Sequence, residues 1–343
     1  MRKLMNTLYV TTPDARLSLQ QENVIVQQGE QTLLRLPLLN IEGIVTFGWA
    51  GASPALMGAC AQRNIALTFL SSSGQFLGRV IGESRGNVVL RKEQYRISDS
   101  EERSLSYAKN FIAGKIYNAR WLLERATRDY PMRLDTERLK DVSGQLKSLI
   151  ESVQSCGDLN ALRALEGNAA SAYFGEFDSL ILQNKDKFKF VRRGRRPPLD
   201  PINAMLSFAY TLLAHECEAA LETVGLDAYV GFLHRDRPGR CSLALDLMEE
   251  LRGVMADRFV LTLVNRKEIN PNDFKTTESR AVHLKDEPRK RFVSAWQERK
   301  KEMITHPFLD ERLEWGLVPY VQAMLLARAI RGDLDAYPPF LWK

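Results

Sequence analysis

The sequence predicts an α+β protein with two domains, a mainly β N-terminal domain and a larger, all-α C-terminal domain. Two observations lead to this prediction. Short runs of β-forming residues fill the first part of the chain, whereas beyond Tyr95 the apolar residues recur with the period of a helix. The polar stretch RISDSEERS follows Tyr95 and has the composition of a linker. We therefore expect one domain over residues 1–95 and another over residues 96–343.

Strands dominate the predicted N-terminal domain, and one helix interrupts them. This helix is expected to begin at Pro54, because Ser53 is a favourable N-cap and proline is favoured in the first turn. β-branched and aromatic residues mark the strands. They are expected at Thr7–Thr11, Arg16–Gln20, Val24–Gln28, Leu33–Leu36, Gly43–Phe47, Ala66–Leu70, Phe76–Ile81 and Val88–Leu90.

Two helices of the C-terminal domain can be placed with some precision. The longer one begins at Pro201, with Asp200 as its N-cap, and Gly225 can close its C-terminus. The other covers ALRALEGNAASAYFGEF, Ala161–Phe177, where apolar residues recur with helical spacing.

A glutamate interrupts the apolar stripe of the second helix. Glu166 lies four residues after Leu162 and seven before Tyr173, so the three side chains share one face. A carboxylate on a core-facing stripe is costly unless a hydrogen-bond donor, a cation or a metal compensates it. Glu166 is therefore a candidate functional residue. The alternative is a structural ion pair with Arg235 or Arg252.

The segment GFLHRDRPGRCSLALDLMEELRGV contributes three more candidates. His234 follows a short apolar run and precedes a basic turn, after which Ser242 is predicted to cap a helix. On this helix Asp246 and Glu249 are three residues apart and point the same way. The alternatives are a structural histidine and a solvated acidic pair.

Together, Glu166, His234 and the acidic pair suggest a site for a divalent cation. Carboxylate oxygens and one imidazole nitrogen suit Mg²⁺ or Mn²⁺, with water and substrate oxygens completing the octahedron. The thiolate set of a structural zinc site and the HExxH motif are both missing from the sequence. A mixed oxygen and nitrogen site among arginines fits phosphodiester chemistry.

Composition and charge narrow the class of protein. The 343 residues are 45% hydrophobic and 26% charged, which is ordinary for a soluble globular protein. A net charge of +6 mildly favours a polyanionic partner such as nucleic acid. The four cysteines have no CxxC spacing, and no apolar stretch approaches membrane-spanning length. We therefore expect a cytoplasmic protein with reduced thiols and no membrane contact.

Two basic segments lie where a DNA substrate would need them. One is KDKFKFVRRGRRPP, and the other surrounds His234. Contacts from Arg and Lys to phosphates supply affinity without reading sequence. For the first segment, a solvated linker is an equally good interpretation. The candidate DNA-binding residues are Arg192, Arg193, Arg195, Arg196, Arg235, Arg237 and Arg240.

Four separated motifs resemble those of the CRISPR-associated adaptation endonucleases, the Cas1 family, and its type I-C members in particular. In chain order they are IEGIVTFGWAGASPALMGACAQRNIALTFLSSSGQFLGRV, ALEGNAASAYF, RRGRRPPLDPINAMLSFAYTLL and GFLHRDRPGRCSLALDLMEELR. The resemblance covers nearly the whole chain. It implies an N-terminal β domain, a helical catalytic domain, a homodimer that we expect to form through the N-terminal domain, and a complex with the small companion protein Cas2.

The resemblance also implies roles for individual residues. The family holds its divalent metal, Mg²⁺ or Mn²⁺, with a Glu, a His and an acidic residue that correspond to Glu166, His234 and Glu249. Many relatives carry Asp at the last of these positions. Asp246 corresponds to a second acidic position of the catalytic site and is expected beside the metal.

The implied function is that of a metal-dependent DNA endonuclease and integrase in antiviral defence. A 3′ hydroxyl of a short foreign DNA attacks a phosphodiester of the CRISPR repeat and so inserts a spacer; hydrolysis is the same step with water. Two alternatives remain. One is a stand-alone metal-dependent nuclease of branched DNA, and the other is a non-catalytic DNA-binding scaffold in which Glu166 forms only a salt bridge.

Overall fold

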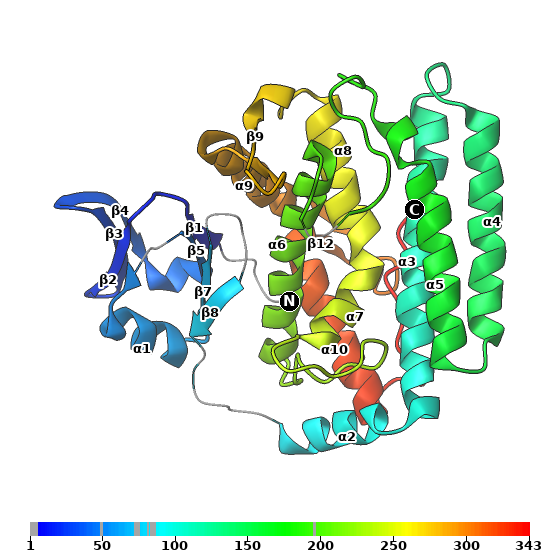
Figure 1. Ribbon diagram of the computed structural model, residues 1–343. Coiled ribbons are helices and arrows are strands. Elements are labelled where there is room, and N and C mark those ends of the chain that lie inside the picture. The colour runs from blue at the N-terminus through cyan, green and yellow to red at the C-terminus, as the bar shows by residue number, and fades with distance from the viewer. Residues whose placement is uncertain (1–5, 49–50, 72–75, 81, 83–86, 195–196) are drawn as a thin grey trace. The chain divides into compact units, whose positions relative to one another are not determined.

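The computed structural model describes residues 6–48, 51–71, 76–80, 82, 87–194 and 197–343. The chain divides into two compact units. The first contains residues 1–85, 284–302 and 314–317, and the second contains residues 86–283, 303–313 and 318–343. The predicted α+β class is confirmed, because the N-terminal part is rich in strands and the C-terminal part is mainly helical (Figure 1).

Two four-stranded sheets form most of the first unit. In one, β1 (Asn6–Val10), β5 (Ile41–Phe47) and β7 (Ala66–Leu70) are parallel, and β8 (Phe76–Val80) pairs antiparallel with β7. In the other the order is β4-β3-β2-β6. Its strands are β2 (Arg16–Gln20), β3 (Asn23–Gln28), β4 (Gln31–Pro37) and β6 (Gly51–Ala52).

The helix predicted in this unit is confirmed as α1 (Pro54–Gln62). The hydroxyl of Ser53 accepts the backbone N–H of Leu56 at 3.3 Å and so caps the first turn. Leu56 and Cys60 are fully buried in a core shared with residues of β2, β3, β5 and β7. A 3₁₀ turn at Leu38–Asn40 precedes β5.

The transition between the two parts differs from the sequence prediction. The predicted strand at Val88–Leu90 is wrong: these residues begin α2 (Val88–Ser98), and Asn87 caps it. The expected linker is also wrong, since only Asp99 and Ser100 separate α2 from α3. The physical reason is the spacing of residues 90, 94 and 97, which places one buried face on a helix.

One C-terminal segment belongs with the first unit. It contains α9 (Asp286–Lys301), and the amide of Gln297 donates to the carbonyl of Thr7 in β1 at 3.2 Å. The boundary expected after residue 95 therefore lies inside α2, and the N-terminal unit recruits a helix from far along the chain. No local pattern in the sequence reports such a long-range pairing.

The second unit is a helical bundle. Its helices α3, α4 and α5 lie side by side (Figure 1), and α6 and α10 contact α7. Two short hairpins, β9–β10 and β11–β12, are strands that the sequence did not predict. The bounds are α3 (Glu101–Asp129), α4 (Thr136–Ser155), α5 (Leu159–Gly175), α6 (Pro201–Thr223), α10 (Val318–Arg331), β9 (Phe274–Thr276), β10 (Val282–Leu284), β11 (Met303–Thr305) and β12 (Arg312–Glu314), with 3₁₀ turns at Phe177–Leu180 and Pro271–Asp273. A further 3₁₀ turn, Trp315–Leu317, belongs to the first unit.

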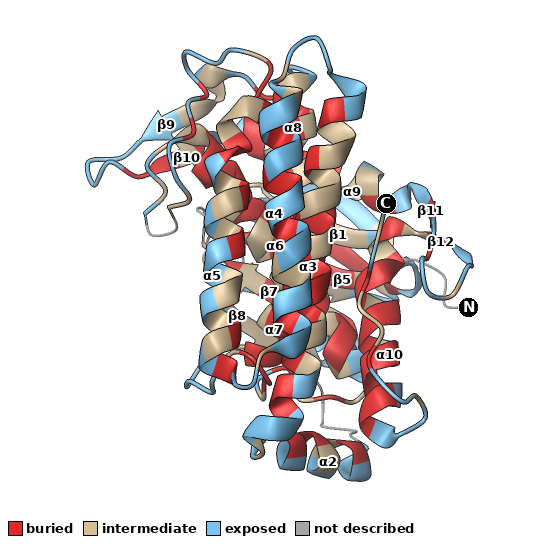
Figure 2. Ribbon diagram, turned by 90° about the vertical axis from the view of Figure 1, so that its right-hand side faces the viewer, coloured by how far each residue is buried: buried red, intermediate tan, exposed pale blue. Residues whose placement is uncertain are grey.

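Burial separates the inner helices of this unit from the outer ones. Figure 2 shows α10 buried along most of its length, whereas α4 has a long exposed face. Every residue of α7 (Ser242–Leu251) except Leu245 is buried. A π-helical segment, Arg252–Asp257, continues α7 into α8 (Arg258–Asn265). Among the described residues, none of the helices combines the length and the hydropathy that a membrane span requires.

The C-terminal segment is anchored against α7 by hydrogen bonds. The buried carboxylate of Glu250 accepts from the Gln322 amide at 2.9 Å, from the Tyr337 hydroxyl and from the Phe340 backbone N–H at 2.8 Å. Asn118 of α3 donates to the carbonyls of Glu250 and Phe340, each at 2.7 Å. These hydrogen bonds hold α3, α7 and the C-terminal segment together.

Candidate metal centre and active site

Two helices and one loop supply the candidate metal ligands. Glu166 comes from α5, Glu249 from α7, and His234 from the loop between α6 and α7. The helix predicted around Glu166 is confirmed as α5, and Asp158 caps it. Because the neighbouring stripe residues Leu162 and Tyr173 are buried, Glu166 reaches the interior while its side chain keeps 29% exposure.

Lys115 of α3 is the partner of Glu166. Its ammonium donates to Oε1 of Glu166 and lies 2.9 Å from Oε2 of Glu249. Neither Arg235 nor Arg252 forms the pair that the sequence suggested. The sequence did contain a sign that Lys115 faces the interior. It shares one stripe of its helix with residues 111 and 118, and both of these are fully buried.

A close approach between α3 and α7 brings Lys115 to Glu249. A Cβ atom at Gly114 would lie 2.9 Å from Cβ of Glu250, which is shorter than carbon atoms tolerate. Glycine therefore permits the two helices to pack at this point. The next residue on α3, Lys115, and the preceding residue on α7, Glu249, form their ion pair beside this contact.

Asp246 organises the loop that carries His234. Its fully buried carboxylate accepts the backbone N–H groups of Phe232 at 2.6 Å, Leu233 at 2.9 Å and His234 at 3.0 Å. It also binds Nδ1 of His234 at 2.6 Å. A carboxylate on Nδ1 favours the tautomer with its proton there, which leaves the lone pair of Nε2 for another partner.

Arg163 ties the same loop to α5. Its guanidinium donates to the carbonyl of Leu233 at 2.7 Å, less than one turn before Glu166 on the helix. The sequence reasoning missed this arginine. Its contact with the residue immediately before His234 holds the imidazole loop against the helix that carries Glu166.

Glu249 lies at the centre of the charged groups. Its Oε1 is 4.0 Å from Nε2 of His234 and 3.0 Å from a guanidinium nitrogen of Arg252. Burial opposes ionisation, yet the charges of Arg252 and Lys115 outweigh it and hold the pKa of Glu249 at about 2. The alternative of a solvated acidic pair is thus excluded by burial of both Asp246 and Glu249.

The side chains offer a donor set that suits a hard divalent cation. Glu166 and Glu249 supply oxygens, and Nε2 of His234 supplies one nitrogen. Oε2 of Glu249 is buried and accepts no bond of hydrogen-bond geometry, although the Lys115 ammonium is close. Within the described residues, no three His, Cys, Asp or Glu side chains are already arranged around one ion position. The donor set fits, and the ammonium now bridges its two carboxylates.

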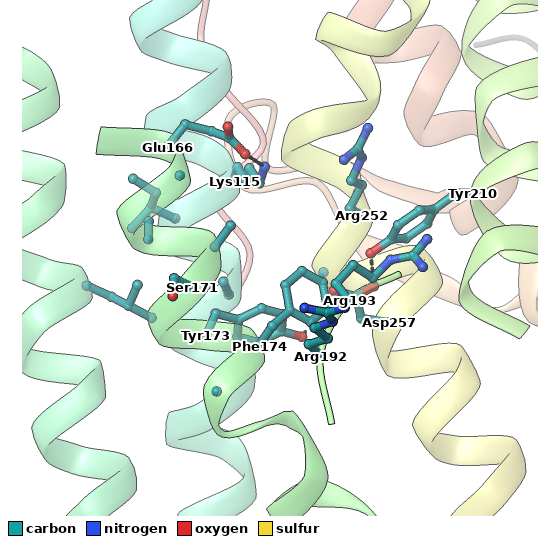
Figure 3. A pocket seen from close by; sticks show the side chains of 18 of the residues that line it. Lys115, Glu166, Ser171, Tyr173, Phe174, Arg192, Arg193, Tyr210, Arg252 and Asp257 are labelled. Carbon is teal, nitrogen blue, oxygen red and sulfur yellow. Dashed lines mark hydrogen bonds and ion pairs between the residues drawn. The ribbon is translucent and has the colours of Figure 1, made fainter. Parts of the chain in front are cut away.

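A cavity of about 480 Å³ opens beside Glu166 and Lys115. Figure 3 shows these two side chains at one end and Arg252, Arg193 and Tyr210 across from them. The Arg193 and Arg252 guanidinium carbons each lie 5.1 Å from the centroid of the Tyr210 ring, within the range of cation–π attraction. The lining therefore combines cationic and aromatic groups suited to a phosphate-bearing ligand.

A buried aspartate holds the aromatic part of this lining. Asp257 accepts the hydroxyls of Tyr210 at 2.6 Å and Tyr173 at 3.1 Å. Burial raises its pKa to about 6, although the phenols and the nearby Arg193 and Arg252 favour the ionised form. Arg252 and Asp257 are the two ends of the π-helical segment, which is a distortion that recurs at functional sites.

The predicted DNA-binding arginines differ in their surroundings. Arg192 is exposed, whereas Arg193 donates to the side chains of Asn203 at 2.7 Å and Ser207 at 3.2 Å. Ser242 does not cap α7 as predicted; its hydroxyl accepts from Arg240 at 3.3 Å. Arg235 and Arg237 are exposed, and Arg195 and Arg196 lie outside the described residues.

Comparison with known proteins identifies the family. The model of the family described as CRISPR associated protein Cas1 matches residues 8–298. The chain belongs to this family. It is 47% identical to CRISPR-associated endonuclease Cas1 1 of Chlorobaculum tepidum and 49% identical to CRISPR-associated endonuclease Cas1 2 of Rhodospirillum rubrum, in both cases over the full length of both chains. The resemblance found in the sequence is confirmed at the level of the Cas1 family, and the type I-C subgroup stays a prediction.

Solved structures support the Cas1 fold. A Cas1 protein from Thermotoga maritima superposes with a TM-score of 0.83 at 21% identity, covering 95% of this chain and 97% of that chain. A casposase bound to integration product gives a TM-score of 0.85 at 22% identity, covering 99% and 95%. At these identities the likeness concerns the fold alone.

Gly231 tests how tightly the His234 loop is packed. A Cβ there would lie 2.9 Å from Oδ2 of Asp246 and 2.9 Å from the carbonyl of His234. We expect Gly231→Ala to lower the free energy of unfolding by about 1–3 kcal/mol, measured in urea, because the loop and the Asp246 carboxylate must both shift. Gly144→Ala, on α4 with open space around it, is the control and should not destabilise. Equal effects of the two variants would contradict a constrained loop.

The low pKa of Glu249 predicts acid sensitivity. In the folded protein this pKa is about 2, below its ordinary 4.5, so the stability it contributes is complete above pH 4.5 and is lost as pH falls to 2. We expect the melting temperature of the metal-free protein to fall more steeply over this window than that of Glu249→Gln. The exposed Glu151→Gln should follow the unmodified protein. Parallel curves for Glu249→Gln and the unmodified protein would contradict the assignment.

Proposed function

We propose that this Cas1 protein is a divalent-metal-dependent DNA endonuclease and integrase of CRISPR adaptation. The observation that carries the proposal is the convergence of Glu166, His234 and Glu249 beside a cavity lined by arginines. Two relatives that match over their full length, with 47% and 49% identity, are named CRISPR-associated endonucleases. We infer that the substrate is double-stranded DNA, both as spacer precursor and as CRISPR repeat.

Each residue of the site has a distinct task in this proposal. Glu166, Glu249 and Nε2 of His234 would hold Mg²⁺ or Mn²⁺, which as a Lewis acid stabilises negative charge on the attacking or leaving phosphate oxygen. Asp246 is a positioning residue, because it fixes the ring and the backbone of His234. Arg252 keeps Glu249 ionised through its 3.0 Å ion pair.

The cationic cavity suits the binding and orientation of the DNA backbone. A 3′ hydroxyl held in line with a phosphodiester of the repeat would attack its phosphorus and form a new phosphodiester, while the P–O bond to the repeat's own 3′ oxygen breaks and that oxygen leaves as a protonated hydroxyl. Water in the same position would give hydrolysis. Holding both reactants in one site makes a reaction between two molecules effectively unimolecular. One constellation of residues thus accounts for both strand joining and cleavage.

A non-catalytic DNA-binding scaffold is the second candidate function. The ion pair of Glu166 with Lys115 favours it, since a compensated carboxylate needs no metal. Metal-dependent turnover of DNA excludes this reading. A strand-joining assay with and without Cas2 distinguishes the integrase from a stand-alone nuclease of branched DNA, because only the integrase depends on Cas2.

For partners, we propose a homodimer formed through the N-terminal unit and a cytoplasmic complex with Cas2, without membrane contact. Membership of the Cas1 family supports this. A Cas6-RT-Cas1–Cas2 complex contains a chain that superposes over 100% of this one with a TM-score of 0.84, at 22% identity and over 36% of that chain. Light scattering of the protein alone and with Cas2 tests both assemblies.

Substitution of the three proposed ligands should abolish catalysis. We expect Glu166→Ala, His234→Ala and Glu249→Ala each to eliminate strand joining and cleavage in Mn²⁺, with circular dichroism showing folded protein. A double variant should be little worse than one substitution, because the ligands act as a unit. Glu151→Ala on the exposed face of α4 is the control. Near-normal activity of the three variants would refute the site.

The exposed arginines should act through phosphate contacts. We expect Arg192→Ala, Arg235→Ala and Arg237→Ala each to weaken DNA binding for all sequences and to reduce the slope of log K against log salt by about 1. Arg193→Ala should lower thermal stability as well, because its guanidinium bonds Asn203 and Ser207. An unchanged salt slope for Arg192→Ala would return KDKFKFVRRGRRPP to the role of a solvated linker.

A further inference from the structure

We propose that Lys115 exchanges partners during catalysis and thereby couples metal binding to DNA binding. Its ammonium balances Glu166 and Glu249 in the metal-free protein, and it binds a DNA phosphate in the adjoining cavity once a divalent ion takes the two carboxylates. This inference rests on the proposed function and adds to it a further substrate-binding residue.

In the metal-free protein, Lys115 contacts both carboxylates. Its side chain is 15% exposed, it donates to Glu166, and it lies 2.9 Å from Oε2 of Glu249, whose side chain is 4% exposed. Two carboxylates from different helices repel each other unless a cation lies between them. Lys115 is that cation, so the packing of α3, α5 and α7 depends on it in the absence of metal.

The ammonium and a bound ion exclude each other. Mg²⁺ binds carboxylate oxygens at about 2.0–2.1 Å, and Mn²⁺ prefers the same type of ligand. An ion held by Glu166 and Glu249 would compete with Lys115 for the same two carboxylates. Like charges at such short range repel, so the ammonium must leave these oxygens when the ion enters.

The displaced ammonium can move into the cavity that it lines, where the described residues offer no carboxylate free to receive it. Lys115 and Glu166 both line the cavity (Figure 3), and the other carboxylate of the lining is Asp257. Asp257 already accepts two phenol hydroxyls, from Tyr173 and Tyr210. A partly buried ammonium without an anion is costly. A phosphate of bound DNA supplies that anion, and Arg252 on the opposite wall offers it a second cation.

Coupling between the two ligands follows from this exchange. Without DNA, the ion must compete with an internal cation, and the released ammonium gains nothing in return. With DNA present, the phosphate accepts the ammonium and the competition disappears. Metal and DNA therefore tighten each other's binding by the same factor, as reciprocal linkage requires. Lys115 therefore disfavours metal binding until DNA is bound.

Calorimetric titration of Mn²⁺ into the full-length protein tests the proposal. The titrations are done with and without a short DNA duplex that carries phosphorothioate linkages and 3′-dideoxy ends, so that turnover is suppressed. For the unmodified protein we expect DNA to tighten Mn²⁺ binding about tenfold or more. For Lys115→Met we expect Mn²⁺ affinity without DNA to rise about tenfold or more, with little further gain from DNA. Lys109→Met is the matched control, since its ammonium on the same helix bonds a backbone carbonyl, that of Gln154, and no carboxylate among the described residues.

Three results would overturn the proposal. One is a Lys115→Met protein that binds Mn²⁺ no more tightly than the unmodified protein, and another is an undiminished effect of DNA in this variant. The third is an unmodified protein that binds no Mn²⁺ in either condition, which overturns the proposed metal centre as well. The first two results would contradict only the proposed exchange of partners by Lys115 and would leave the proposed metal centre unaffected.

A second measurement needs no variant and covers the case in which Lys115→Met does not fold. Lysines of the unmodified protein are acetylated with an N-hydroxysuccinimide ester, and the rate at each site is followed by mass spectrometry. We expect Mn²⁺ to accelerate acetylation of Lys115, because the ion releases its ammonium from the carboxylates. Lys109 serves as the internal standard. An unchanged ratio of the two rates with and without Mn²⁺ would overturn the exchange.

Discussion

The structure depends on the compensation of buried negative charge along α7. Asp246, Glu249 and Glu250 are all buried within little more than one turn, and each has a different kind of partner. Backbone N–H groups and His234 compensate Asp246, and cations compensate Glu249. Neutral donors bind Glu250, whose pKa burial still raises to about 7. Uncompensated carboxylates at these positions would cost more than the fold can supply. The helices and loops around α7 are held where these partners must be.

This constraint explains features of the chain that otherwise look unrelated. At Gly114, α3 lies so close to α7 that a Cβ atom would come within 2.9 Å of Glu250, and Gly231 fills a space with no room for a side chain. The π-helical segment places Arg252 against Glu249 and Asp257 under the tyrosines of the cavity. Each feature brings a donor or cation within reach of a particular carboxylate. The site is therefore part of the framework and not an addition to its surface.

The same charges serve two functions that are easily confused. A carboxylate paired with a lysine is a structural ion pair, and a carboxylate bound to a divalent ion is a ligand. Glu249, with its pKa held at about 2, is ionised throughout the pH range in which proteins function and can serve in either role. What separates the two roles is the freedom of Lys115 to leave, since its stem is flexible and the cavity lies beside it.

The α+β class, the helix around Glu166, the candidates His234, Asp246 and Glu249, and the family could all be predicted from the sequence, because periodicity, caps and motifs are local. Which groups these residues contact became clear only in the folded chain. The tertiary structure assigned Glu166 to Lys115 and the Asp246 carboxylate to the His234 loop, and it joined α9 to the N-terminal unit. Such pairings join residues tens to hundreds of positions apart. They are chosen by packing and charge compensation across the whole fold, which spacing along one helix does not encode.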